Sequence, residues 1–231
     1  MTTQKIDICM TSTIRPKILE ITLKSFLTNM LKDQSKFRLI INIDPIGENL
    51  SQKVILKVAK KYFDDIIHNY PKEPSFTKAV HWCWSKATSK YIFHLEEDWR
   101  LLIPINIYSM ITILESYPKL STLRLNKGNS GRNKFGVKHG FIYYPKLSLN
   151  PSLIKTEFIK PILPLMNLKR NPEKQLRIVN SPPGISEYLS LWTHGIYVKD
   201  SIGKVVQDIG RDWMRNSSYT KKTGFLKWEK K

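Results

Sequence analysis

The first hundred residues alternate short apolar runs with amphipathic segments, and this alternation constrains the fold more than any other feature. The amphipathic segments place apolar residues three and four positions apart, as helices do. The run 37–43 is almost continuously apolar, which is typical of a parallel strand covered on both faces. We therefore expect an α/β fold, a mostly parallel twisted sheet flanked by helices, with ligands at the carboxyl ends of the strands. The expected strands are 6–10, 37–43, 66–68 and 91–95, and the expected helices are 16–31, 51–63 and 76–87.

The rhythm changes after residue 100. A helix is expected over 104–117 and strands over 122–126 and 141–144, with a glycine-rich basic loop, 127–140, between the two strands. Prolines then limit the helices to short pieces, one of which should begin near Pro172. Because no interdomain linker is evident, we expect one domain over 1–231, with an elaborated second half and a basic tail.

The chain is strongly basic, with 38 Lys and Arg against 19 Asp and Glu, a net charge of +19. Residues 119–231 hold 22 basic and 7 acidic side chains, so +15 of this charge lies in the second half. Such a field attracts polyanions and favours a phosphate-rich partner. A lysine-rich composition that serves solubility is the alternative.

One motif carries the most chemistry. The apolar run at 91–95 leads directly into Glu96, Glu97 and Asp98, so a strand delivers three carboxylates to its carboxyl end. Such a cluster is reasonable where a divalent cation and a diphosphate share the site, since hard oxygen ligands suit Mg²⁺ or Mn²⁺. A solvated acidic turn is the alternative.

Four features occur in the order and spacing of the nucleotide-sugar half of GT-A glycosyltransferases. They are the segment from Thr11 through Thr13 to Arg15, the strand ending in Asp44, the helix start around Lys78, and the acidic motif. Over about residues 5–100 the sequence resembles the family 2-like enzymes, although Thr11 stands where the family usually has proline and Glu96 where it has aspartate. The resemblance implies the following site: Thr11, Thr13, Arg15 and Asp44 hold the nucleoside, Lys78 approaches the phosphates or base, Asp98 binds the metal, and Glu96 supports the metal or the ribose.

The resemblance is looser in the acceptor half, residues 101–231. The segment starting at Ser148 resembles the family strand that follows the acceptor loop, and Glu173 then occupies the place of the catalytic base, with Glu187 in reserve. Asp208 stands where the family often has a histidine that returns to the metal, with His194 as the other possible ligand and Arg211 as a diphosphate contact. Each of these residues also has a purely structural alternative.

Together these features imply a metal-dependent, inverting glycosyltransferase that uses a UDP-linked sugar and Mn²⁺ or Mg²⁺. The charge favours DNA as acceptor, so we expect a hydroxymethylated base to be glycosylated, as in phage-type DNA-modifying transferases. The backbone contacts would come from Lys127, Arg132, Lys134 and Lys138.

Two other functions stay open: transfer to a cell-envelope glycan or lipid-linked acceptor, and nonenzymatic nucleic-acid binding by a degenerate GT-A fold. The sequence has no apolar run long enough to span a membrane and no secretory signal pattern. We therefore expect a soluble cytoplasmic protein, in the host cytoplasm if phage-encoded. The two cysteines, Cys9 and Cys83, are expected to be buried thiols.

Overall fold

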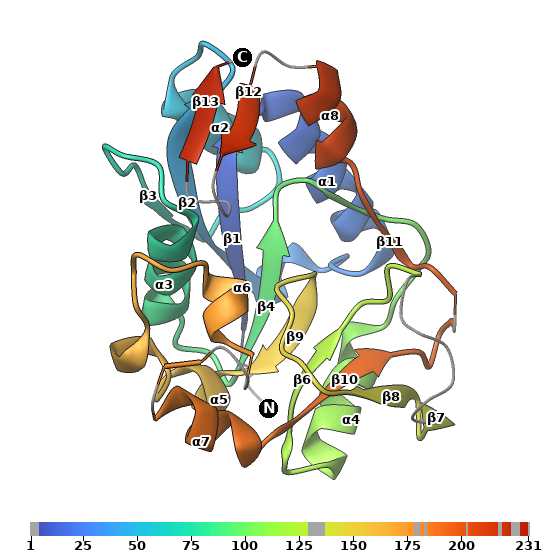
Figure 1. Ribbon diagram of the computed structural model, residues 1–231. Coiled ribbons are helices and arrows are strands. Elements are labelled where there is room, and N and C mark those ends of the chain that lie inside the picture. Colours follow the sequence, from blue (N-terminus) through green and yellow to red (C-terminus); the bar gives the residue numbers. More distant parts are fainter. Residues whose placement is uncertain are drawn as a thin grey trace.

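A nine-stranded sheet forms the centre of the molecule, with strand order β3-β2-β1-β4-β9-β6-β10-β8-β7 (Figure 1). The computed structural model describes residues 5–128, 137–177, 181–182, 184–201, 203–216, 219–222 and 227–230. The strands of the sheet are β1 (Ile6–Ile14), β2 (Phe37–Gly47), β3 (Ile66–Asn69), β4 (Tyr91–Glu96), β6 (Leu120–Arg124), β7 (Val137–Lys138), β8 (Phe141–Tyr144), β9 (Ser152–Lys155) and β10 (Thr193–Tyr197).

The pairing makes most of this sheet run in one direction. Strands β3, β2, β1 and β4 pair in parallel, whereas β9 pairs antiparallel with both β4 and β6. Strand β6 therefore points the same way as β4, and β10 is parallel to β6. As a consequence, the carboxyl ends of β2, β1, β4 and β6 meet at one edge of the sheet, where such folds bind ligands.

Helices cover both faces of the sheet (Figure 1). One apolar cluster contains residues of α1, α2 and α4, and a second contains residues of α3, α5 and α7. Two small antiparallel ribbons, β5–β11 and β12–β13, complete the described structure. The remaining elements are α1 (Pro16–Asn29), η1 (Gln34–Lys36), α2 (Gln52–Ala59), α3 (Phe76–Lys86), β5 (Trp99–Leu101), α4 (Ile107–Ser116), α5 (Thr156–Ile159), η2 (Leu163–Leu165), α6 (Pro172–Gln175), α7 (Ile185–Ser190), β11 (Val206–Asp208), α8 (Gly210–Asn216), β12 (Tyr219–Lys222) and β13 (Lys227–Lys230).

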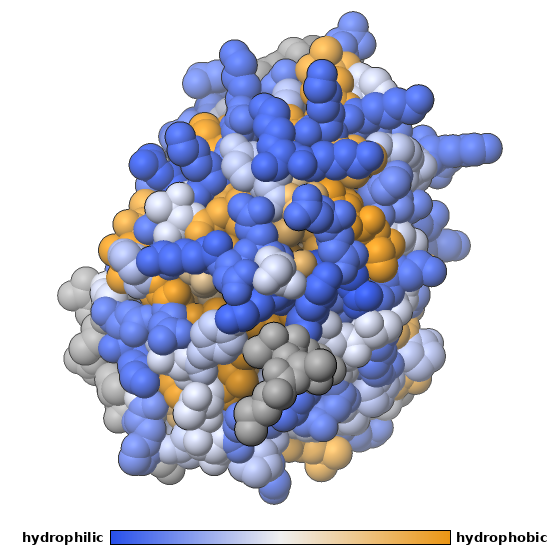
Figure 2. Space-filling model, turned by 180° about the vertical axis from the view of Figure 1, so that it is seen from behind, coloured by the Kyte–Doolittle hydropathy of each residue, from blue (hydrophilic) through white to orange (hydrophobic). Residues whose placement is uncertain are grey.

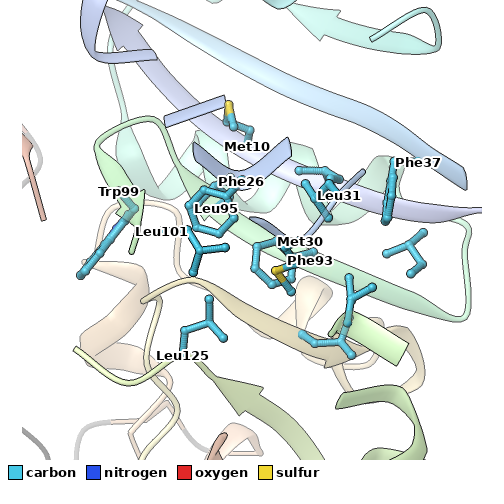
Figure 3. Packing of buried hydrophobic residues seen from close by; sticks show 14 of the residues in the cluster. Met10, Phe26, Met30, Leu31, Phe37, Phe93, Leu95, Trp99, Leu101 and Leu125 are labelled. Carbon is cyan, nitrogen blue, oxygen red and sulfur yellow. The ribbon is translucent and has the colours of Figure 1, made fainter. Parts of the chain in front are cut away.

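The alternation of strand side chains explains why both faces are apolar. In β1, Met10 packs with Phe26 of α1 and Phe93 of β4 in the first cluster (Figure 3). The neighbouring Cys9 points to the opposite face and joins the second cluster. Both Cys9 and Cys83 are free, buried thiols, as expected from the sequence.

The α/β class and every strand and helix expected in the first hundred residues are confirmed, with shifts at the ends. Strand β2 continues to Gly47 and helix α2 ends earlier, at Ala59. Beyond residue 100 the short helices α5 and α6 fit the proline-rich sequence, since each spans four residues. The insertion of β9 between β4 and β6 is not readable from local pattern, because the pairing joins distant segments.

The surface is mostly polar. Hydrophilic side chains cover much of the face opposite to that of Figure 1, with hydrophobic residues visible between them (Figure 2). In the described part of the chain, no helix is both long and apolar enough to cross a bilayer.

Candidate functional site

A pocket opens at the edge of the sheet where the carboxyl ends of β2, β1 and β4 meet. Its walls come from both halves of the chain, because the loop before β9, helix α6 and the start of α8 close it on the far side. The lining residues are Thr11, Ser12, Thr13, Arg15, Asp44, Pro74, Ser75, Phe76, Glu96, Glu97, Asp98, Trp99, Lys127, Leu149, Asn150, Asn171, Glu173, Asp208 and Arg211.

A buried ion pair between Arg15 and Glu97 forms the floor of this pocket. The Arg15 Nη2 atom lies 2.6 Å from Glu97 Oε1, and both side chains are at most 5% exposed. The same carboxylate oxygen accepts hydrogen bonds from the Thr13 backbone N–H at 2.9 Å and from its hydroxyl at 2.6 Å. Thr22 of α1 donates to the Glu97 carbonyl, so the turn after β4 is tied to both β1 and α1.

Asp98 continues this network toward the pocket. Its Oδ2 atom lies 2.9 Å from Arg15 Nη2, and its side chain is 16% exposed. Helix α8 closes over it: a side chain at Gly210 would overlap the Asp98 carboxylate, and the ring of Trp213 lies 5.1 Å from the Arg15 guanidinium. Burial lowers the pKa of Arg15, but the charges and hydrogen bonds of Glu97 and Asp98 together raise it by more. The net shift of this pKa is therefore upward, and the guanidinium stays charged.

Asp44 lines the pocket from the last part of β2, shortly before that strand ends at Gly47. Its carboxylate accepts hydrogen bonds from Asn42 Nδ2 at 2.8 Å and from the Ser75 backbone N–H at 3.0 Å. Burial raises the pKa of Asp44 to about 6, and the two hydrogen bonds oppose that shift. An acceptor group of this kind can recognise an N–H or O–H donor on a bound ring.

Glu173 faces the pocket from helix α6, which lies in front of the sheet (Figure 1). Asn171 caps this helix by accepting a hydrogen bond from the Lys174 N–H. Ser148 donates to Glu173 Oε1 at 3.2 Å, and Arg177 Nη2 lies 3.4 Å from Oε2. The side chain is 34% exposed, so its carboxylate is held in place yet accessible.

The fold brings most of the expected site residues together. Thr11, Thr13, Arg15, Asp44, Glu96, Asp98, Lys127, Glu173, Asp208 and Arg211 all line the pocket. Three do not: Lys78 is exposed on α3, Glu187 is exposed on α7, and His194 is buried in β10. The His194 Nδ1 atom lies 2.7 Å from Ser121 Oγ, and burial lowers the pKa of this histidine to about 4.

The basic loop is the least informative part of the expected site. Arg132 and Lys134 lie outside the described residues. The backbone of Lys138 belongs to β7, but its side chain is also outside the description. Lys127 is the member of this group that the structure places in the pocket lining.

The carboxylates fit a divalent cation that is shared with a substrate. Among the described residues, no three His, Cys, Asp or Glu side chains gather closely enough to enclose an ion. Magnesium sites of the kind that bind phosphates use one or two carboxylates and take the other ligands from phosphate and water. Asp98 and Asp208 are both hard oxygen donors in the lining, and each has one carboxylate oxygen, Oδ2, 2.9 Å from an arginine, Arg15 and Arg211 respectively.

Several residues of the site were missed at the sequence level. Glu97 was recognised as part of the acidic motif, but its position as the buried partner of Arg15 was not. Trp213 and Asn42 contribute through contacts that join distant segments. One signal was available for Glu97: strand alternation makes one of two successive residues at the end of a strand point inward.

Comparisons with solved structures show a GT-A type fold. The structure of S. aureus TarS matches with a TM-score of 0.57 and 12% identity over 87% of this chain and 36% of that chain. A TarS structure, residues 1–349 in complex with UDP-GlcNAc, matches with a TM-score of 0.54 and 13% identity over 87% and 57% of the respective chains. The mannosyltransferase PcManGT from Pyrobaculum calidifontis, in complex with GDP-Man and Mn²⁺, matches with a TM-score of 0.56 and 9% identity over 84% and 56%.

The present chain thus spans between about a third and three fifths of the length of these proteins. No protein-family model matches the sequence, and the search of curated proteins found no match. At such low identities the likeness establishes the fold: an α/β glycosyltransferase-like sheet with helices on both faces.

The packing of α8 on Asp98 can be tested with a pair of glycine variants. Gly210→Ala adds a methyl group that overlaps the Asp98 carboxylate, whereas at Gly203 the new atom would lie 3.3 Å from Ser201 Oγ. We expect Gly210→Ala to lower the free energy of unfolding by about 1–3 kcal/mol, as overpacking does. Gly203→Ala should change it by less than about 1 kcal/mol. Urea denaturation measures both values, and equal effects would contradict the close approach of α8.

Proposed function

We propose that this protein is a glycosyltransferase that moves a sugar from a nucleotide-diphosphate donor, a UDP-sugar, to a hydroxyl group of an acceptor. The observation that carries the proposal is the pocket itself. It combines the end of β1, Asp44 and the acidic motif at the ligand-binding edge of a GT-A type sheet. Solved proteins of the same fold hold UDP-GlcNAc or GDP-Man, which supports this choice of donor.

The donor would lie along the edge of the sheet. Asp44 would accept a hydrogen bond from the nucleoside, and Thr11 and Thr13 would border it. The diphosphate would then lie beside Asp98. The Arg15 guanidinium is bonded to both carboxylates of the turn, so it supports the diphosphate subsite from below and holds Asp98 in position.

The transfer would be a direct displacement with inversion at the anomeric carbon. Glu173 would take the proton of the acceptor hydroxyl as its oxygen bonds to the anomeric carbon, and the bond from that carbon to the diphosphate breaks. The electron pair leaves with the nucleoside diphosphate. Ser148 and Arg177 hold the Glu173 carboxylate, which orients it for this role.

Asp98, assisted by Glu96 or Asp208, would hold a divalent cation, Mn²⁺ or Mg²⁺. Bound there, such an ion neutralises charge on the departing diphosphate. The PcManGT complex with GDP-Man and Mn²⁺ supports the choice of ion. Arg211 is 74% exposed at the rim of the pocket and would add a positive charge on the same side.

For the acceptor, we propose a hydroxymethylated base in DNA, because the net charge of +19 favours a polyanionic substrate. Lys127 lies in the pocket lining, at the start of the basic loop, and would contact the backbone of such an acceptor. The target base would leave the stack so that its hydroxyl reaches Glu173.

A transfer assay tests the proposal and its acceptor together. The 231-residue chain is offered UDP-sugars with hydroxymethylated DNA, unmodified DNA or a lipid-linked glycan, with and without Mn²⁺, and the products are identified by mass spectrometry. We expect metal-dependent transfer to hydroxymethylated DNA. Glu173→Gln should slow it by about 10²–10⁴-fold, the usual contribution of a general base. The matched variant Glu187→Gln, on the exposed surface of α7, should leave the rate unchanged.

The outcomes separate the alternatives. Transfer only to the lipid-linked glycan would contradict the proposal that DNA is the acceptor, but it would support the proposed glycosyltransferase activity. Salt-dependent binding of DNA without any affinity for UDP-sugars would contradict the proposal that the protein is a glycosyltransferase.

The raised pKa of Asp44 predicts how donor binding depends on pH. With a pKa of about 6, the carboxylate is ionised at neutral pH and gains a proton as the pH falls. Binding that needs the ionised carboxylate is complete above this pKa, and we expect it to weaken by about tenfold per pH unit below it. Calorimetry with a UDP-sugar measures the dissociation constant without interference, since its diphosphate diester stays ionised.

Asp44→Asn should remove this pH dependence. The control variant Asp65→Asn, which removes an exposed carboxylate that pairs with Lys5, should preserve it. The same slope in wild type and Asp44→Asn would exclude Asp44 from the donor site.

A further inference from the structure

A second polar cluster lies on the sheet face that carries α3, α5 and α7, two strands beyond the acidic motif. Arg124 ends β6, and Ser152 of β9 lies directly opposite it in the ladder. Thr122 shares this face two residues earlier. Asn150, which precedes β9, lines the pocket beside Glu173. All four side chains are at least nine-tenths buried.

These side chains hold hydrogen-bonding atoms without partners. Within the described ranges, nothing accepts a hydrogen bond from Arg124 Nε, and Asn150 Nδ2, Ser152 Oγ and Thr122 Oγ1 are also unpaired. Arg124 is the most costly member, since it is 5% exposed and forms no ion pair with a described residue. A buried charge without a partner is destabilising, and a ligand that pairs with Arg124 would offset this cost.

The surroundings keep the guanidinium in place for such a ligand. The ring of Tyr144 lies 3.9 Å from the Arg124 Cζ atom, a stacking contact that fixes the plane of the group. Burial lowers the pKa of Arg124, and the smaller contributions of Tyr144 and then Glu173 oppose that shift. Arg177 already offsets the charge of Glu173 at 3.4 Å.

The strand order gives the direction in which the cluster lies. From β2 through β1 to β4, the edge carries Asp44, the end of β1 and the acidic motif. Strands β9 and β6 follow, and Asn150 before β9 and Lys127 after β6 line the same pocket as Glu173. The cluster therefore adjoins the part of the pocket assigned to the acceptor. Its unpaired groups can all donate hydrogen bonds, and a planar guanidinium pairs with phosphate through two parallel bonds.

We propose that Arg124, stacked on Tyr144 and assisted by Asn150 and Ser152, is an acceptor subsite that binds a phosphate group close to the hydroxyl facing Glu173. The inference rests on the proposed function for the choice of the acceptor side. It adds that the acceptor carries a phosphate near its reacting hydroxyl.

The test measures binding of inorganic phosphate to the full chain by ³¹P line broadening, at constant ionic strength and with UDP and Mg²⁺ present to fill the donor site. Arg124→Gln should weaken phosphate binding by at least about tenfold. Lys90→Gln, which removes an exposed charge paired with Glu115 near the start of β4, should leave binding unchanged. Equal affinity in wild type and Arg124→Gln would overturn the proposal.

Thermal unfolding of the same variants separates a binding role from a structural one. Removing an unpaired buried charge should raise the Tm, so Arg124→Gln and Arg124→Met are both expected to be more stable than wild type in the absence of phosphate. A lower Tm for both variants, or failure of both to fold, would make Arg124 a structural residue and would refute the subsite.

Competition identifies the source of the phosphate. Displacement by a hydroxymethylated oligonucleotide would indicate a DNA phosphodiester, and displacement by glycerol 3-phosphate alone would indicate a smaller phosphorylated acceptor; both support the subsite. Displacement by acetate as effectively as by either phosphate compound would contradict it. UDP binding is measured separately by calorimetry, and phosphate binding is repeated without UDP, so a failed donor site is distinguished from a failed phosphate subsite.

Discussion

The ion pair between Arg15 and Glu97 is the interaction on which the pocket depends. It joins the end of β1 to the turn after β4, and both charges are almost completely buried, so losing Arg15 would leave the buried Glu97 carboxylate without its charged partner. Thr13 and Thr22 complete the hydrogen bonding of this turn from β1 and α1. Because Asp98 follows Glu97 directly and shares the same guanidinium, its position at the pocket is a consequence of this buried pair.

The sheet arranges the proposed chemistry along one line. Parallel pairing brings the ends of β2, β1 and β4 to one edge, which provides places for a nucleoside near Asp44 and a diphosphate near Asp98. The antiparallel strand β9 then separates β4 from β6, and Arg124 at the end of β6 belongs with Glu173 to the proposed acceptor side. Helix α8 returns from the end of the chain to cover Arg15 with Trp213. Both halves of the sequence line the pocket: most residues of the proposed donor side come from the first half, and Asp208 and Arg211 come from the second.

The sequence was informative where local pattern determines structure. Strand and helix periodicity predicted the secondary structure of the first hundred residues. The acidic motif and Asp44 could be placed at the same edge of the sheet, because the carboxyl ends of parallel strands meet there. Strand alternation could indicate that Glu97 points inward, but local pattern could not identify Arg15 as its partner, since that contact spans 82 residues. It also placed His194 among metal-ligand candidates, whereas the structure buries it against Phe158, because β10 pairs with β6 in the interior of the sheet. Arg124 belongs to no recognisable sequence motif. Only the structure shows that its Nε atom is buried without a hydrogen-bond partner among the described residues.

The central claim is that the pocket above the Arg15–Glu97 pair is a nucleotide-sugar site, and a crystal structure of the full chain with UDP and Mn²⁺ tests it most directly. The account predicts the uracil ring against Asp44, the diphosphate and metal beside Asp98, and an unbroken contact between Arg15 and Glu97 beneath them. UDP bound away from this edge of the sheet, or a diphosphate that takes Arg15 from Glu97, would contradict it.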